Sequence, residues 1–126
     1  MQILTIFDPD QYVINIIAGI GQFQSIRINN LSRDMIMTYQ PEPNQANQLG
    51  IIYACVPAVI AEMQYLSTCH AKFFYIIDRD DPLRKQSPLG GERFLPWSIG
   101  YFVYPFDHDD HYAIEHRLVT YFFGRG

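Results

Sequence analysis

Short apolar blocks, separated by polar residues, glycines and prolines, run along the whole of this chain. Blocks that are rich in Ile, Val, Tyr and Phe favour β-strands. On this basis the pattern predicts strands at 2–7, 12–18, 23–28, 51–56, 72–78, 94–104 and 113–123. Turn-forming residues end the first two blocks, because Pro9 follows an aspartate and Gly19 and Gly21 follow the second run.

One segment has the spacing of a helix instead. After Pro57, apolar residues recur at intervals that place them on a single helix face, namely Val59, Ile60, Met63 and Leu66. Proline suits the first position of a helix, where its missing N–H would have no partner. The main helix is therefore predicted at 57–69. An alternative helix begins earlier and bends at Pro57.

These elements together predict the fold class and the domain organisation. The expected fold is α+β, a single globular domain covering 1–126. Its sheet would be mostly antiparallel, with about five to seven strands and the main helix packed on one face. The segment 29–39 fits a short helix or a strand, and the polar segment 40–50, with its two prolines, is predicted to be a loop.

Composition and charge narrow the class of protein. Apolar residues make up 48% of the chain and aromatic residues 15%, which is enough for one sizeable core and unlike a disordered chain. The formal net charge is −4, and only nine residues are Lys or Arg. Because nonspecific nucleic-acid binding depends on basic residues, this balance argues against direct contact with nucleic acid and favours a basic partner.

Cysteine content and the N-terminal sequence bear on the compartment. Cys55 and Cys69 are the only two cysteines and are predicted to be buried, reduced thiols. The N-terminal block lacks a basic leader followed by a long apolar run, so no signal peptide is expected. No apolar stretch approaches the roughly 18 residues of a membrane helix. A cytoplasmic protein without membrane contact is the expectation.

The stretch from Tyr104 to Arg117 carries the most unusual local composition. It holds three of the four histidines, together with several carboxylates and aromatic residues. Aromatic side chains anchor protein interfaces, and complementary charge steers the partners together. The residues predicted to bind a partner are Tyr104, Phe106, Asp107, Asp109, Asp110, Tyr112 and Glu115. The sequence thus favours an inhibitor or immunity-type protein that masks a basic toxin or nucleic-acid-processing enzyme, with no cofactor.

Two other functions stay open. In the first, the same stretch is the centre of a small metal-dependent or histidine-based hydrolase or nuclease, because imidazoles and carboxylates are metal ligands and acid–base groups. The residues for such a site are His108, Asp110, His111 and His116. The spacing is unlike that of a helical HExxH motif. In the second, the chain is a subunit of a homodimer with no chemistry of its own.

The expected strand at 113–123 also predicts where side chains point. Alternation along a strand would place His116 on the core-facing side and Glu115 on the opposite side. A further set of carboxylates, Asp78, Asp80 and Asp81, follows the apolar block 72–78. Since Asp81 precedes Pro82, a plain turn is the favoured interpretation there.

Overall fold

The computed structural model describes residues 2–41, 47–69, 72–78, 81–82, 100–104 and 111–124. Within these ranges the strands are β1 (Ile3–Phe7), β2 (Arg27–Leu31), β3 (Gln48–Tyr53), β4 (Phe73–Asp78) and β5 (Gly100–Tyr104). The α-helices are α1 (Tyr12–Ile17), α2 (Ile60–Ser67) and α4 (His111–Phe123). Two 3-10 helices, η1 (Gly21–Phe23) and η2 (Arg33–Thr38), flank β2.

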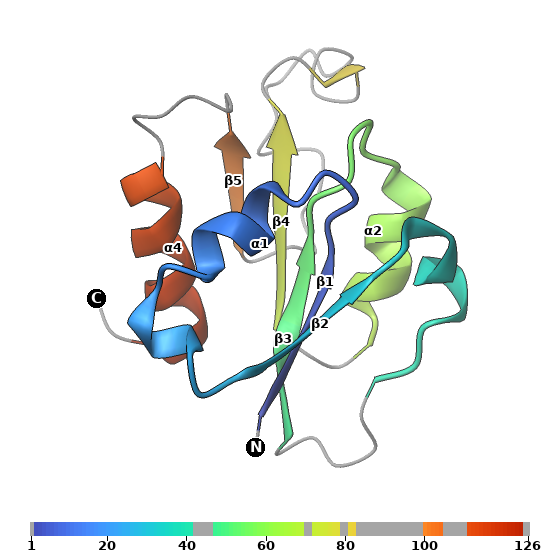
Figure 1. Cartoon of the computed structure of the whole chain (residues 1–126). Helices are drawn as coiled ribbons and strands as arrows, with labels where there is room; N and C mark the ends of the chain where they lie inside the picture. The colour runs from blue at the N-terminus through green and yellow to red at the C-terminus, as the bar shows by residue number, and fades with distance from the viewer. Residues whose placement is uncertain are drawn as a thin grey trace.

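The sheet is parallel throughout, and the prediction of a mostly antiparallel α+β sheet is wrong. Its five strands lie in the order β2-β1-β3-β4-β5, and every neighbouring pair is parallel. Because parallel strands need crossover connections, helical segments lie on both faces of the sheet (Figure 1). This is the doubly wound α/β architecture, in which the strand order reverses between β1 and β3.

The composition of the central strands explains the parallel arrangement. Along β4, Phe73, Tyr75 and Ile77 belong to the core on one face of the sheet. Phe74 and Ile76 belong to the core on the other face. A strand that is buried on both faces is apolar at every position, as strands of parallel sheets usually are. An antiparallel sheet with one solvated face would instead need polar residues at alternate positions.

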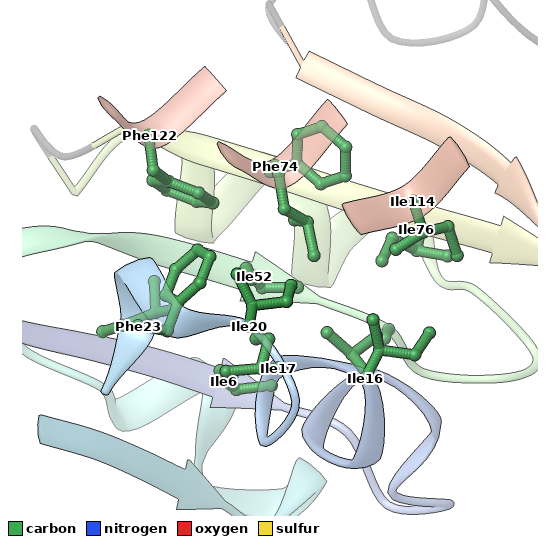
Figure 2. Close-up of a cluster of buried hydrophobic side chains, with 14 of the residues drawn as sticks. Ile6, Ile16, Ile17, Ile20, Phe23, Ile52, Phe74, Ile76, Ile114 and Phe122 are labelled. Atoms are coloured by element: carbon green, nitrogen blue, oxygen red, sulfur yellow. The ribbon is translucent and has the colours of Figure 1, made fainter. Parts of the chain in front are cut away.

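Helices α1 and α4 cover the first face, so the strands predicted at 12–18 and 113–123 are both wrong. Figure 2 shows side chains of α4 meeting side chains of α1 and of the sheet. In α4, Ile114, Leu118 and Phe122 are buried at four-residue intervals, which lie on one side of a helix. The same spacing is even-numbered, so it also satisfies the alternation of a strand. The structure resolves this ambiguity in favour of the helix.

The second face is covered by α2 and η2. Met63 and Leu66 of α2 are fully buried there, together with Ile36 of η2. The predicted main helix is confirmed in kind, but α2 begins at Ile60, and Pro57 lies before it instead of at its first position. Both cysteines are buried and free, as predicted.

Strand β2 forms one edge of the sheet and is more exposed than the central strands. The strand predicted at 23–28 is misplaced, because η1 occupies its first part and β2 begins at Arg27. None of the helices in the described part of the chain is long and apolar enough to cross a membrane.

Candidate functional site

A candidate functional site lies at the carboxyl ends of β1, β2 and β3. In doubly wound sheets, ligands bind outside the carboxyl ends of the strands, where the strand order reverses. Here that point lies between β1 and β3. Asp8 follows β1, Arg33 follows β2, and Tyr53 ends β3. The parallel arrangement therefore gathers polar residues that are far apart in the sequence.

A hydrogen-bonded network ties the end of β3 to α2 and η2. The Tyr53 hydroxyl donates to Glu62 Oε1 at 2.7 Å and accepts the backbone N–H of Val59 at 2.9 Å. Arg33 Nη2 donates to the same Glu62 oxygen at 2.9 Å, and Arg33 Nε donates to both carboxylate oxygens at 3.1 and 3.2 Å. Arg33 Nη2 also donates to the carbonyl of Pro57. These groups hold one another and fix the segment that leads from β3 to α2.

Tyr53 and Cys55, at the carboxyl end of β3, are poorly suited to act as nucleophiles. Burial raises the pKa of the Cys55 thiol to about 12. Burial also raises the pKa of Tyr53, and its hydrogen bond to Glu62 adds to the effect. Since the thiolate and not the thiol attacks a substrate, the raised pKa of Cys55 disfavours it as a nucleophile near neutral pH. Both act as neutral, buried parts of the core on the α2 face.

Asp8 is a fully buried carboxyl group that holds the start of α1. Its Oδ2 atom accepts the N–H groups of Val13 at 2.7 Å and Ile14 at 3.0 Å, which lie in the first turn of the helix. Its Oδ1 atom is buried and has no hydrogen-bond partner among the residues that the structure describes. Burial therefore raises the pKa of Asp8, although the hydrogen bonds to the helix oppose that shift. Asp8 also contributes, with Arg33 and Asn30, to a shallow pocket of about 360 Å³.

The buried carboxyl group of Asp8 predicts a specific dependence of stability on pH. Because its pKa in the folded protein is raised above the ordinary value of 3.8, the folded state keeps a proton that the unfolded state loses. This contribution to stability is present below that ordinary value and is lost as the pH rises through the raised value. We expect Asp8→Asn, which cannot titrate, to become more stable relative to the wild type between acidic and neutral pH. Urea denaturation across that range measures the difference.

The exposed carboxylate of Asp34 supplies the control. Asp34→Asn changes a carboxylate that lies at the surface on η2. Comparison with this variant separates the effect of burying a carboxyl group from the effect of an Asp-to-Asn change as such. If the curve of Asp8→Asn ran parallel to that of the wild type, burial of an ionisable Asp8 would be refuted.

The carboxylate of Asp81 links two segments of the chain. Its side chain is buried, and Oδ2 accepts the backbone N–H of Ala58 at 2.7 Å. That contact joins the segment after β4 to the segment after β3. The backbone of Ala58 thus engages the Asp81 carboxylate, while Asp80 lies outside the described residues.

The predicted partner-binding segment is described only in part. Phe106, Asp107, Asp109 and Asp110 lie outside the described residues, and so does His108. Tyr104 ends β5, and His111 begins α4. Tyr112 and Glu115 both lie on α4, where Tyr112 is 81% exposed and Glu115 is partly exposed.

The helical conformation of α4 changes how these residues are grouped. His116 is exposed, so the prediction that it faces the core is wrong. Residues three and four positions apart lie on the same side of a helix. Tyr112, Glu115 and His116 therefore form one outward-facing row, which we call the α4 outer face. The strand interpretation had separated Glu115 from His116.

The metal-site alternative gains no support within the described residues. Among them, no three His, Cys, Asp or Glu side chains gather closely enough to hold a metal ion. Of the four proposed ligands, only His111 and His116 fall in the described part of α4.

Comparisons with known proteins do not indicate a function for this chain. Neither protein-family models, nor curated proteins, nor solved structures show a match to this chain.

The sequence patterns did not indicate the residues that bond to one another at the carboxyl ends of the strands. Asp8 was interpreted only as part of a turn, and Arg33, Tyr53 and Glu62 were assigned no role. The one available signal was the position of Asp8 directly after the first apolar block. In a parallel sheet such positions meet at one edge, but the parallel arrangement itself was not predicted.

Proposed function

We propose that this protein acts by binding a protein partner with a basic surface, as a cytoplasmic inhibitor or immunity-type protein. The contact surface is the α4 outer face together with the acidic segment that precedes it in the sequence. The observation that carries the proposal is the exposure of Tyr112, which is 81% accessible at the start of α4. A large aromatic side chain in that position is available to anchor an interface.

The packing of α4 supports this role. Its apolar side is fully used by the core, since Ile114, Leu118 and Phe122 are buried. The α4 outer face, in contrast, contributes little to the core, so its composition is free to serve binding. Glu115 adds a carboxylate beside Tyr112, and the segment 107–110 adds three aspartates. Carboxylates around an aromatic anchor would attract and orient a basic surface.

The contacts among residues at the carboxyl ends of the strands also favour a binding function over a catalytic one. Glu62 and Arg33 are paired with each other, and the Tyr53 hydroxyl is bonded to both Glu62 and Val59. The Cys55 thiol is buried, and its raised pKa keeps it protonated at neutral pH. These described groups maintain the structure, which leaves the exposed aromatic and acidic surface as the better candidate for function.

Photo-crosslinking at two positions tests the proposal. A photoreactive phenylalanine analogue is placed at Tyr112 in one variant and at Met37 in the other, and both are produced in the cells of origin. Met37 is a matched control because it is 52% exposed on η2, on the opposite face of the sheet. We expect position 112, and not position 37, to trap a specific protein with a basic surface.

Affinity measurements with the trapped and purified partner complete the test. Tyr112→Ala should weaken binding roughly thirtyfold, the loss typical of an aromatic hot spot, while Met37→Ala should leave the affinity unchanged. Charge reversal at Asp107, Asp109 and Asp110 should also weaken binding, with the largest effect at low salt. Equal trapping at both positions, or equal affinities for the two alanine variants, would reject the proposal.

A further inference from the structure

The outer edge of β2 has backbone groups that face away from the sheet. The N–H of Arg27 donates to the carbonyl of Gln2 at 2.9 Å, so Arg27 bonds toward β1. In a parallel pair, alternate residues bond to the same neighbouring strand. Residues 29 and 31 therefore also face β1, whereas Ile28 and Asn30 direct their N–H and C=O groups outward. No other described strand pairs with this edge.

An apolar groove lies beside this edge, on the α1 face of the sheet. It has a volume of about 270 Å³ and is lined mainly by Ile14, Ile17, Phe23, Ile26 and Ile28. Pockets that hold drug-sized molecules usually measure roughly 300–1,000 Å³. The groove is therefore better matched to one apolar side chain than to a whole small molecule. Ile28 links the two features, because its backbone faces outward and its side chain lines the groove.

We propose that β2 and this groove together bind an extended segment of a protein partner, which adds as an antiparallel strand. A residue opposite Ile28 would exchange two hydrogen bonds with it, and a second residue opposite Asn30 would do the same. The side chain opposite Ile28 is apolar and fills the groove. Strand β2 lies at the sheet edge opposite to β5, and the groove shares no lining residue with the α4 outer face, so the two surfaces are distinct.

Charge and side-chain alternation define the partner segment further. The side chain of Arg27 is exposed and has no hydrogen bond or ion pair with a described residue. Its side chain lies on the sheet face opposite to that of Ile28, because successive residues of a strand alternate. The bound segment therefore carries an acidic residue next to its apolar residue, where the acidic residue can reach Arg27. Alternating apolar and acidic residues are the expected signature.

A second copy of this chain fits the edge poorly. Self-pairing that satisfies both outward-facing residues would place Ile28 opposite Asn30 of the second copy. An amide would then lie against the apolar groove, where it would lose hydrogen bonds to water. Each copy also carries a net charge of −4, so two copies repel each other. A foreign apolar and acidic segment avoids both costs.

Peptide display on the full-length protein tests the inference. Random eight-residue peptides are selected for binding, and the selected peptides are titrated against the purified protein and its variants. We expect enrichment of peptides with alternating apolar and acidic residues, and shifts of the backbone amide signals of Ile28 and Asn30 in NMR spectra. Asn30→Pro removes one outward N–H while leaving the bonds to β1, and should weaken binding about tenfold. Ala18→Phe, which fills the groove from an exposed position, should abolish binding.

The controls separate this surface from the α4 outer face. Tyr112→Ala should bind the selected peptides with wild-type affinity, and Asn30→Pro should bind the partner trapped at position 112 with wild-type affinity. The inference is overturned if no such peptides are enriched, or if they bind equally to Asn30→Pro and Ala18→Phe. It is also overturned if sedimentation shows a dimer of the wild type that Asn30→Pro dissociates.

Discussion

Replacing Gly50 with alanine is expected to lower the free energy of unfolding by about 3 kcal/mol, at the upper end of the usual range for overpacking. Gly50 is buried in β3, directly beneath the ring of Phe122 in α4. A Cβ atom at this position would overlap Phe122 Cε1 and lie 2.8 Å from the carbonyl oxygen of Lys72. The glycine thus allows α4 to pack closely on the sheet.

Neither neighbour of Gly50 can move away at low cost. The Lys72 carbonyl accepts the N–H of Ile51 at 2.8 Å, so its displacement would break a bond between β3 and the start of β4. The Phe122 ring packs near the rings of Phe74 and Phe23, with centroids 6.3 and 6.4 Å away. Its rotation would disturb the core that Figure 2 shows. The strain therefore has no simple local relief.

Thermal and urea denaturation of three variants measure this effect. Gly50→Ala should melt roughly 10 °C below the wild type. Gly21→Ala is the matched control, since nothing lies within 4 Å of a Cβ atom there, and its stability should change by less than about 0.5 kcal/mol. Adding Phe122→Leu to Gly50→Ala should recover part of the loss, because it removes the ring edge. Wild-type stability of Gly50→Ala would refute the packing of α4 on β3.

Removing the carboxylate of Glu62 should cost about 2 kcal/mol of stability. Glu62→Ala leaves the Tyr53 hydroxyl without its acceptor and the Arg33 guanidinium without its counterion. The side chains of Arg33 and Glu62 are 27% and 16% exposed, so water can partly replace the lost contacts. For that reason the expected loss is smaller than for a fully buried ion pair.

A double-mutant cycle isolates the pair. Arg33→Ala and the double variant are measured with Glu62→Ala, and the coupling between the two residues should be about 1 kcal/mol. Glu115→Ala is the control, because Glu115 is also partly exposed but forms no ion pair with a described residue. Its stability should be close to that of the wild type. Additive effects of Arg33→Ala and Glu62→Ala would show that the network does not hold β3 to α2.

Local patterns predicted some elements well and others poorly. The strands at 2–7, 51–56 and 72–78 overlap β1, β3 and β4, because unbroken runs of Ile, Phe and Tyr are typical of buried strands. The segments 12–18 and 113–123 have the same β-branched and aromatic composition, yet they fold as helices. In the segment 12–18 the buried residues are Val13, Ile16 and Ile17, and this spacing is typical of a helix. The β-branched composition of the segment nevertheless favoured a strand in the sequence-based prediction.

The predicted site shows the same division. The sequence singles out Tyr112 because acidic and aromatic residues surround it; the structure shows that it is exposed, and its role in binding stays a prediction. The grouping of Tyr112 with Glu115 and His116 depended on whether α4 is a helix. The network of Arg33, Tyr53 and Glu62 joins three separate elements, and no local pattern in the sequence indicates it.

The sequence by itself determined that this chain folds around a large aromatic and aliphatic core, that both cysteines are buried, and that an acidic segment precedes its last element. Only the tertiary structure decided that the strands are parallel and that 12–17 and 111–123 are helices. The reason is physical. Burial against the sheet stabilises a β-branched segment as a helix even when its intrinsic preference is for a strand, and that burial depends on contacts between residues far apart in the chain.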